Sequence, residues 1–144
     1  MTTRMTTAEK QAFLAEPHVG VLSIARADAG PLTVPVWYDY RPGATLWFLT
    51  DRNSRKGRLL EVGTRVSLCA QTEEAPYRYV SVEGPVTALD AVSDELLPMA
   101  IRYLGEEGGR AYVDSSDVED NVVVRIEPQN WLAVDYRKIH PAAG

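Results

Sequence analysis

Residues 50–58, TDRNSRKGR, gather the side chains of this sequence that are best suited to bind an anion. Four cations lie in this stretch: Arg52, Arg55, Lys56 and Arg58. The whole chain carries a formal charge of −5, and without these four cations 11 Lys and Arg stand against 20 Asp and Glu, a balance of −9. Guanidinium and ammonium groups form strong, charge-assisted hydrogen bonds with phosphate. The cluster therefore indicates a phosphate site in an otherwise acidic protein.

The position of the cluster at a helix start strengthens this interpretation. A helix is predicted to begin after Asn53 or Ser54, and exposed cations in a first turn each cost roughly 0.3–1 kcal/mol against the helix dipole. A bound phosphate would reverse that sign, Thr50 and Ser54 add hydroxyls, and Gly57 would let a ligand come close. The GxxxxGK[ST] pattern of a P-loop is absent. The alternative is a solvated helix face whose cations pair with Asp51 and Glu61.

Aromatic residues lie on the two predicted strands that precede this turn. The first strand carries Trp37 and Tyr38, and the second carries Trp47 and Phe48. Aromatics beside a phosphate site suit a flat, partly apolar ligand with a phosphate tail. Core or dimer-interface packing is the alternative, which we favour for Trp47 and Phe48, whereas both interpretations stay open for Trp37 and Tyr38.

Hydrophobic alternation and turn signals predict the elements that must position these residues. Strands are predicted over residues 19–26, 32–40, 45–50, 64–72, 77–89, 121–128 and 130–138, and helices over 6–16, 54–63 and 93–109. Strands 32–40 and 45–50 should form a hairpin, and Gly84-Pro85 should bend the long strand. The acidic stretch 111–121 is expected to be a surface loop.

This pattern predicts a mainly β fold with a few helices, in a closed or nearly closed antiparallel barrel of six or seven strands. Several strands are apolar on both faces, which suggests that a helix or a second subunit covers the outside. We expect one domain over residues 1–144, with loosely held ends at 1–5 and 139–144. The single cysteine, Cys69, and the lack of a signal peptide or a membrane-length apolar run favour a cytoplasmic protein.

Several known residue patterns recur in order along the chain. VPVWYDYRPGATLWFLTDRNSRKGRLLEVGTRVSL (34–68) and YRYVSVEGPV (77–86) resemble the pyridoxamine 5′-phosphate oxidase-like superfamily of FMN-binding split barrels. The likeness is strongest to the small flavin/deazaflavin oxidoreductases, many of which use F420, and it runs from about residue 8 to 137. The pieces that carry it are PVWY, then Thr50, Ser54, Lys56 and Leu60, then RVSL, and finally Val82 and Gly84.

This resemblance implies a homodimeric split barrel with two cofactor sites at the subunit interface. Thr50, Ser54, Arg55 and Lys56 would hold the cofactor phosphate. The ring would lie against a wall formed by Val34, Pro35, Val36, Trp37 and Tyr38. Trp131 would approach the partner's cofactor. The spare cations Arg52 and Arg58 favour F420 over FMN, because F420 adds a tail with several carboxylates.

The implied function is an F420- or FMN-dependent oxidoreductase that moves a hydride to or from a small unsaturated or aromatic molecule. Tyr38 and Tyr79 are candidate proton donors by location only, and for both we favour the alternative of a barrel or interface aromatic. The chain end lacks the basic motif of the pyridoxamine phosphate oxidases proper, which argues against vitamin B6 oxidation. No metal site is predicted, because His18 and His140 are isolated.

Two other functions are weighed against the enzyme. The first is a non-catalytic carrier of flavin, deazaflavin, haem or tetrapyrrole. The second is single-stranded nucleic acid binding through the basic turn, which the net charge of −5 and the narrow cation patch disfavour. The expected partners are thus a second copy of the chain and a small molecule, with neither nucleic acid nor a membrane.

Overall fold

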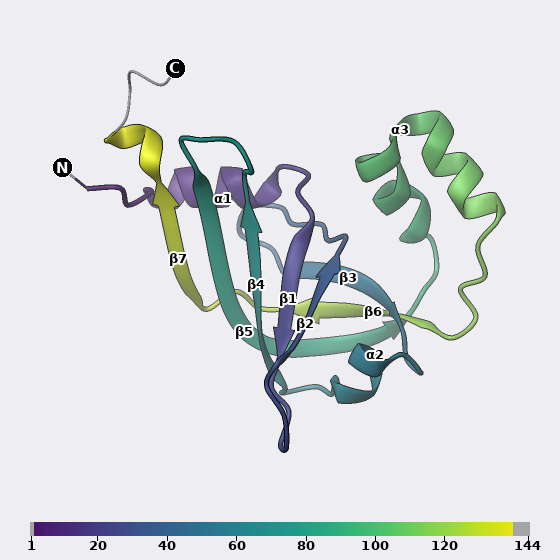
Figure 1. Ribbon diagram of the computed structural model, residues 1–144. Coiled ribbons are helices and arrows are strands. Elements are labelled where there is room, and N and C mark those ends of the chain that lie inside the picture. The colour runs from purple at the N-terminus through teal and green to yellow at the C-terminus, as the bar shows by residue number, and fades with distance from the viewer. Residues whose placement is uncertain (1, 140–144) are drawn as a thin grey trace.

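A computed structural model describes residues 2–139 as one antiparallel sheet of seven strands with three α-helices. The strands are β1 (Gly20–Ile24), β2 (Leu32–Val36), β3 (Leu46–Asp51), β4 (Arg65–Gln71), β5 (Arg78–Ala91), β6 (Asn121–Ile126) and β7 (Asn130–Asp135). The sheet order is β2-β1-β4-β5-β6-β3, and β7 pairs with β5 on the side. The prediction of a mainly β, antiparallel fold of six or seven strands is confirmed. The sheet curls into a half-barrel (Figure 1).

Strand β5 joins the two parts of the sheet because it changes partners along its length. Its first half pairs with β4 and β7, and its second half pairs with β6 from Val86 onward. At the changeover, a Cβ on Gly84 would collide with the backbone carbonyl of Glu127. The register slips between Val86 and Ala88. The bend predicted at Gly84-Pro85 is therefore confirmed, and the curved β5 is visible in Figure 1.

The hairpin predicted between strands 32–40 and 45–50 is wrong. Strand β2 ends at Val36 and pairs with β1, whereas β3 pairs with β6. A single bridge remains, in which the backbones of Asp39 and Trp47 exchange hydrogen bonds of 2.9 and 3.0 Å. This bridge connects the segment that follows β2 with β3. Since β2 and β3 stand at the two ends of the strand order, it brings these two edges of the sheet close together.

The core fills the inside of the curled sheet. Alternate residues of each strand point inward, among them Leu22, Phe48, Leu68 and Val80, which are all buried. Burial of such apolar side chains is the main force that holds the sheet in its curl.

Helix α1 (Thr7–Ala15) packs Phe13 and Leu14 into the same core. The predicted capping box is confirmed, since Thr6 Oγ1 accepts from the Glu9 amide and the Glu9 carboxylate accepts from the Thr6 amide. The predicted helix over 6–16 thus differs from α1 by one residue at each end.

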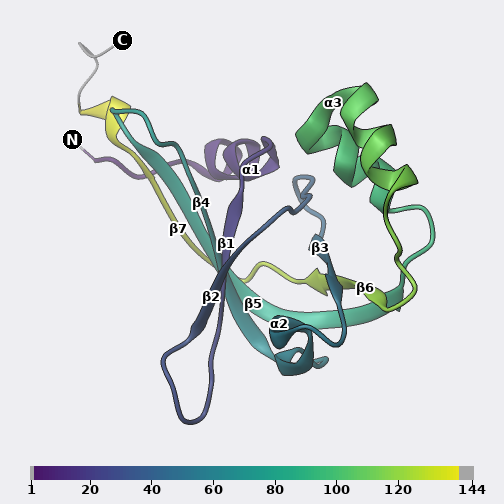
Figure 2. The ribbon, with the colours of Figure 1, turned by 45° about the vertical axis from the view of Figure 1, so that its right-hand side comes forward.

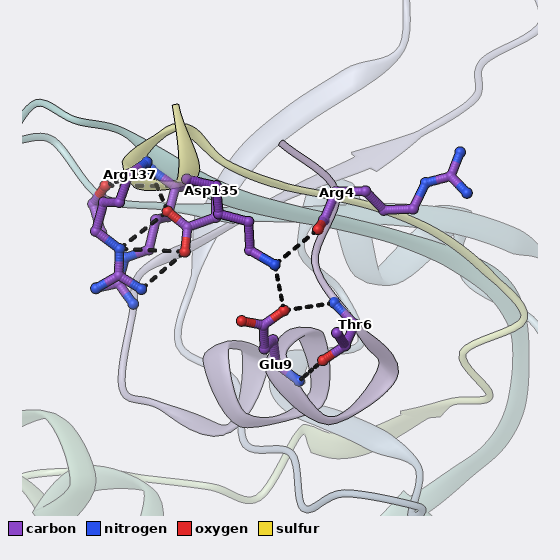
Figure 3. A network of polar contacts seen from close by, with 8 residues as sticks. Arg4, Thr6, Glu9, Asp135 and Arg137 are labelled. Carbon is purple, nitrogen blue, oxygen red and sulfur yellow. Dashed lines mark hydrogen bonds and ion pairs between the residues drawn. The ribbon is translucent and has the colours of Figure 1, made fainter. Parts of the chain in front are cut away.

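The N-terminal residues are held more firmly than expected. Met5 is buried and its amide donates to the Ala133 carbonyl, while Arg4 forms a bridge with Val134. Around this contact, Lys138 donates to Glu9 at 2.7 Å (Figure 3). The expectation of a loose segment over residues 1–5 is therefore wrong for residues 4 and 5, whereas residues 1 and 140–144 lie outside the described residues.

A second ion pair near the C-terminal end fixes the short 3₁₀ helix Tyr136–Lys138. Arg137 forms a fork on the buried carboxylate of Asp135, with nitrogen–oxygen distances of 2.9 to 3.2 Å (Figure 3). These bonds hold the pKa of Asp135 below its usual range.

The other two helices flank the sheet. Helix α2 (Arg55–Leu59) is much shorter than the predicted 54–63, and α3 (Leu96–Asp114) extends beyond the predicted 93–109. Residues 111–114 are therefore helical rather than part of a loop. Figures 1 and 2 show two helical segments side by side within α3. No helix among the described residues is long and apolar enough to cross a membrane.

Candidate functional site

One pocket of about 370 Å³ brings together the predicted ring wall and one predicted phosphate ligand. It lies where the end of β2 meets β3, α2 and α3. Its lining residues are Val19, Pro35, Val36, Trp37, Leu49, Lys56, Leu96, Met99, Tyr112 and Asn121. Seven of these ten are apolar or indole side chains, and Lys56 supplies the charge. A mainly apolar wall with a few polar groups is typical of small-molecule sites.

The cations of residues 50–58 form no ion pair within the described part of the chain. The alternative of pairing to Asp51 and Glu61 is thus not supported among residues 2–139. Arg52, Arg55 and Arg58 are exposed, whereas Lys56 is half-buried in the pocket wall. Lys56 is therefore the cation of the cluster that borders this pocket.

The hydroxyls of the predicted phosphate site are engaged in local structure. Ser54 Oγ accepts from the Gly57 amide at 3.1 Å as the helix N-cap and lies 2.6 Å from the Asp51 carbonyl, to which it donates. Thr50 is buried, and its hydroxyl lies 3.2 Å from that of Ser54. Thr50 and Arg52 border a separate hollow of about 220 Å³. Of the four predicted phosphate ligands, Lys56 thus lines the first pocket and Thr50 the second, while Ser54 and Arg55 line neither.

The structure contradicts two expectations about the basic turn, one on its helix and one on Gly57. Helix α2 has five residues, and Lys56 and Arg58 also belong to its last turn, so the helix dipole gives little reason for a bound anion. A Cβ on Gly57 would collide with the Asp51 carbonyl. The glycine is therefore required by the turn itself, whatever approaches from outside.

Three of the five residues that the resemblance assigns to a cofactor ring line the pocket. Pro35, Val36 and Trp37 line the pocket, while Val34 packs against the core and faces Leu22 across the ladder. The Trp37 ring is stacked on Tyr103 with a centroid distance of 5.1 Å and an interplanar angle of 4°.

Tyr38 lies behind this wall rather than in it. Its side chain is completely buried, and its hydroxyl donates to the Leu14 carbonyl at 2.8 Å. Burial raises the pKa of Tyr38 far above its ordinary value. A phenol with its proton committed to the core cannot pass that proton to a ligand in the pocket, so Tyr38 is a core residue.

Tyr79 and Trp131 lie away from the pocket of this chain. Tyr79 is half-buried on β5, and the alternation of that strand places it on the outer side. Trp131 packs edge-on against Tyr40 at 5.9 Å and lies beneath the Lys10 ammonium at 5.0 Å. It borders a different hollow of about 440 Å³. Its predicted approach to a partner's cofactor stays a prediction.

The pocket residues on α3 were missed by the sequence argument. Leu96 and Met99 are three residues apart and so share one face of the helix, which is a recognisable signal. Tyr112 reaches the pocket only because the backbone breaks at Gly105, where φ is 80°. Helical periodicity across that break would place Tyr112 wrongly.

Comparisons with known proteins agree with this fold. The family model of pyridoxamine 5′-phosphate oxidase matches residues 6–135. No curated protein sequence matches the chain. An F420 reductase is 24% identical, with 85% of this chain and 94% of that chain covered and a TM-score of 0.71.

Two mycobacterial structures are also similar. A conserved hypothetical protein from Mycobacterium tuberculosis is 24% identical over 96% of this chain and 90% of its own, with a TM-score of 0.75. An FAD and heme binding protein from Mycobacterium smegmatis is 16% identical over 98% and 79%, with a TM-score of 0.65. At these identities the structures establish the fold. With the family model, they show that the chain belongs to the pyridoxamine 5′-phosphate oxidase-like family of FMN-binding split barrels.

Proposed function

We propose that this protein binds the ring system of F420 or FMN in the 370 Å³ pocket and acts as an oxidoreductase. The observation that carries the proposal is that Lys56, a cation without an ion-pair partner in the described chain, borders the same pocket as Pro35, Val36 and Trp37. A flat ring can lie against the apolar wall while an anionic group meets the ammonium. The similar F420 reductase fold supports the same assignment.

The bound cofactor would supply the hydride chemistry on a small unsaturated or aromatic substrate. The residues of the chain itself would bind the cofactor and orient the substrate beside it. Trp37, Leu96 and Met99 exclude water from the ring, and Lys56 fixes the anionic group. Among the pocket residues the remaining polar side chains are those of Tyr112 and Asn121, so either could hold a polar atom of the substrate in place.

The alternative is a carrier that binds the cofactor without turnover. The lining of the pocket gives this alternative a basis, since Lys56 and Tyr112 are its only titratable residues and no acid–base pair faces the ring wall. The similar FAD and heme binding protein shows that the fold is also found in proteins named for binding alone.

Two measurements, made one after the other, test the proposal. The pure protein is titrated separately with F420 and with FMN, and we expect saturable binding with F420 the tighter ligand. It is then mixed without oxygen with reduced cofactor and a panel of enones, quinones and tetrapyrroles. Reoxidation by one class of acceptor supports the enzyme, and its absence with every acceptor supports the carrier. If the protein binds neither cofactor, both the enzyme and the carrier proposals are wrong.

We also propose that a second copy of the chain covers the outer face of the sheet beside the pocket. The register aligns Pro35, Val21, Cys69, Ser81 and Leu132 across five strands. Val21 and Leu132 in this row are 38% and 58% exposed. Because Pro35 also lines the pocket, a partner on this row would border the ligand and complete the site.

The oligomeric state tests this surface. Light scattering behind a sizing column should give the mass of a dimer for the native chain. Leu132→Glu should shift it to the monomer, because a carboxylate would be buried without a partner. Val62→Glu, at an exposed valine outside this row, is the matched control. A monomeric native protein would contradict the proposal.

A further inference from the structure

Trp37 is held in the pocket wall by residues of α3 that lie behind it. Strand β2 ends at Val36, so the peptide of Tyr38 has no ladder partner. The Tyr38 amide donates to the Tyr103 hydroxyl at 3.0 Å, and Arg102 Nε donates to the Tyr38 carbonyl at 2.9 Å. Side chains of α3 thus replace the missing strand at the residue that follows Trp37.

The Tyr103 hydroxyl joins a third segment to this contact. It lies 2.6 Å from the His18 carbonyl and 2.8 Å from the Tyr38 carbonyl, and its single proton suits the shorter of the two. Tyr103 therefore accepts from one segment and donates to another while its ring lies flat on the Trp37 indole. Arg102 adds hydrogen bonds of 2.9 Å to the carbonyls of Ala15 and Glu16 at the end of α1.

The second half of α3 also reaches the Trp37 indole. In a straight helix, Tyr103 and Tyr112 would be about 13 Å apart along the axis. Both rings nevertheless lie near Trp37, with centroid distances of 5.1 and 5.3 Å. The backbone reverses at Gly105, and Gly109 packs so tightly on Ile101 that an added Cβ would lie 2.7 Å from that side chain.

We infer that Tyr103, supported by Arg102, is a positioning residue that sets the orientation of Trp37 before a ligand binds. Resting on the proposed function, the inference extends it by assigning α3 a role in cofactor affinity. A wall whose orientation is fixed in the free protein does not need to be ordered by the ligand, which improves affinity. Tyr103 does not appear among the residues that line the pocket, so it acts through Trp37.

The test follows the environment of Trp37 directly. Acrylamide quenching is measured for the native protein, Tyr103→Phe and Tyr103→Leu, each with a matching Trp37→Phe variant whose signal is subtracted to remove Trp47 and Trp131. Phe keeps the stacked ring and loses the hydroxyl, whereas Leu loses both. We expect quenching of Trp37 to rise in the order Tyr, Phe, Leu, and cofactor affinity to fall on the order of tenfold for Leu and less for Phe.

Leu104→Ala is the matched control, because Leu104 is the next residue of the same helix and is 45% exposed. It should leave quenching and affinity unchanged. A role in stability alone would lower the melting temperature of the Tyr103 variants without changing the quenching of the folded protein, and that result overturns the inference. Increased quenching with unchanged affinity also overturns it, because the wall would then not contact the ligand.

Two further outcomes are distinguishable. If the native protein binds neither F420 nor FMN, the proposed function fails, while the quenching series still decides whether Tyr103 positions Trp37. If Tyr103→Leu does not fold, Tyr103→Phe decides alone. Unchanged quenching in that variant contradicts the role of the hydroxyl, since its bonds to His18 and Tyr38 would be absent.

Discussion

The two sides of the pocket are built in opposite ways. The wall at Trp37 is fixed by hydrogen bonds between the Tyr38 backbone behind it and the side chains of Arg102 and Tyr103. The basic turn, residues 50–58, contributes the half-buried Lys56 to the pocket, and none of its cations forms an ion pair within residues 2–139. Changes in the wall should therefore reduce stability first, whereas changes in the turn should reduce only affinity.

The largest expected effect is on the wall, through Arg102→Met. The Arg102 side chain is 15% exposed. Its guanidinium donates to three carbonyls, and Nη1 lies 3.4 Å from the Asp39 carboxylate. Hydrogen bonds from a charged group contribute roughly 1.5–3 kcal/mol, so we expect unfolding free energy to fall by about 3 kcal/mol. Urea unfolding measures it.

Arg110→Met provides the control on the same helix. The Arg110 side chain is 61% exposed, and within residues 2–139 its ion-pair partner is Glu106, one turn away. An exposed pair of this kind contributes about 0.3–0.5 kcal/mol. Equal losses for the two variants would mean that the wall is no more firmly held than the surface.

The second prediction concerns the turn. Replacement of Lys56 and Arg55 together by Ala should lower cofactor affinity by well over tenfold, roughly 1.4 kcal/mol or more, because charge-assisted contacts to an anion are lost. The urea midpoint should not change, since neither side chain forms an ion pair in residues 2–139. Titration with each cofactor measures the first quantity. Unchanged affinity would identify the cluster as a solvated surface.

The same contrast explains what the sequence could predict. Local signals are reliable here: the capping box of Thr6 and Glu9 and the bend at Gly84 are confirmed, and of the two predicted helix starts, after Asn53 or after Ser54, the structure has the second. Each depends on residues within a few positions of one another or on a backbone that tolerates no side chain.

Pairings between distant segments could not be predicted in this way. The hairpin was predicted because a short turn separates two apolar strands. In the structure β2 instead pairs along its length with β1, and the backbone of Tyr38 forms hydrogen bonds with side chains of α3. The reversal of α3 at Gly105 also defeats helical periodicity, which is why Tyr112 was missed. The family resemblance located Pro35, Trp37 and Lys56 because it carries information about such distant contacts.

A smaller effect is expected for Tyr38→Phe. The change removes one buried hydrogen bond to the Leu14 carbonyl and keeps the ring. Loss of such a bond costs about 1 kcal/mol, since the carbonyl is left without that donor. Unfolding free energy should fall by this amount, while cofactor affinity and any turnover stay the same. Abolished turnover with a native melting curve would restore Tyr38 as a candidate proton donor.

The alkaline limit of stability should depend on the same phenol. Burial raises the pKa of folded Tyr38 above the value of about 10 expected in the unfolded chain. The corresponding stability is complete below about pH 10 and is lost as pH rises from there toward the folded pKa, because the unfolded state then releases the proton. Tyr38→Phe should therefore weaken the decline of the urea midpoint above pH 10. An identical decline in both proteins would show that other groups cause it.

The smallest effect distinguishes the two cofactors. Arg52 and Arg58 are exposed, and neither is among the residues that line the 370 Å³ pocket. A ring and one phosphate held there need neither cation, so replacing both by Ala should leave FMN affinity unchanged. A tail of carboxylates extending over the turn would meet them in water, where each pair contributes about 0.2–1 kcal/mol. The two cations together should thus account for at least about a twofold loss of F420 affinity, and the loss should shrink as salt screens the pairs. Equal affinities for F420 before and after the change would mean that the tail does not reach the turn, and the preference for F420 over FMN would then have no basis in these cations.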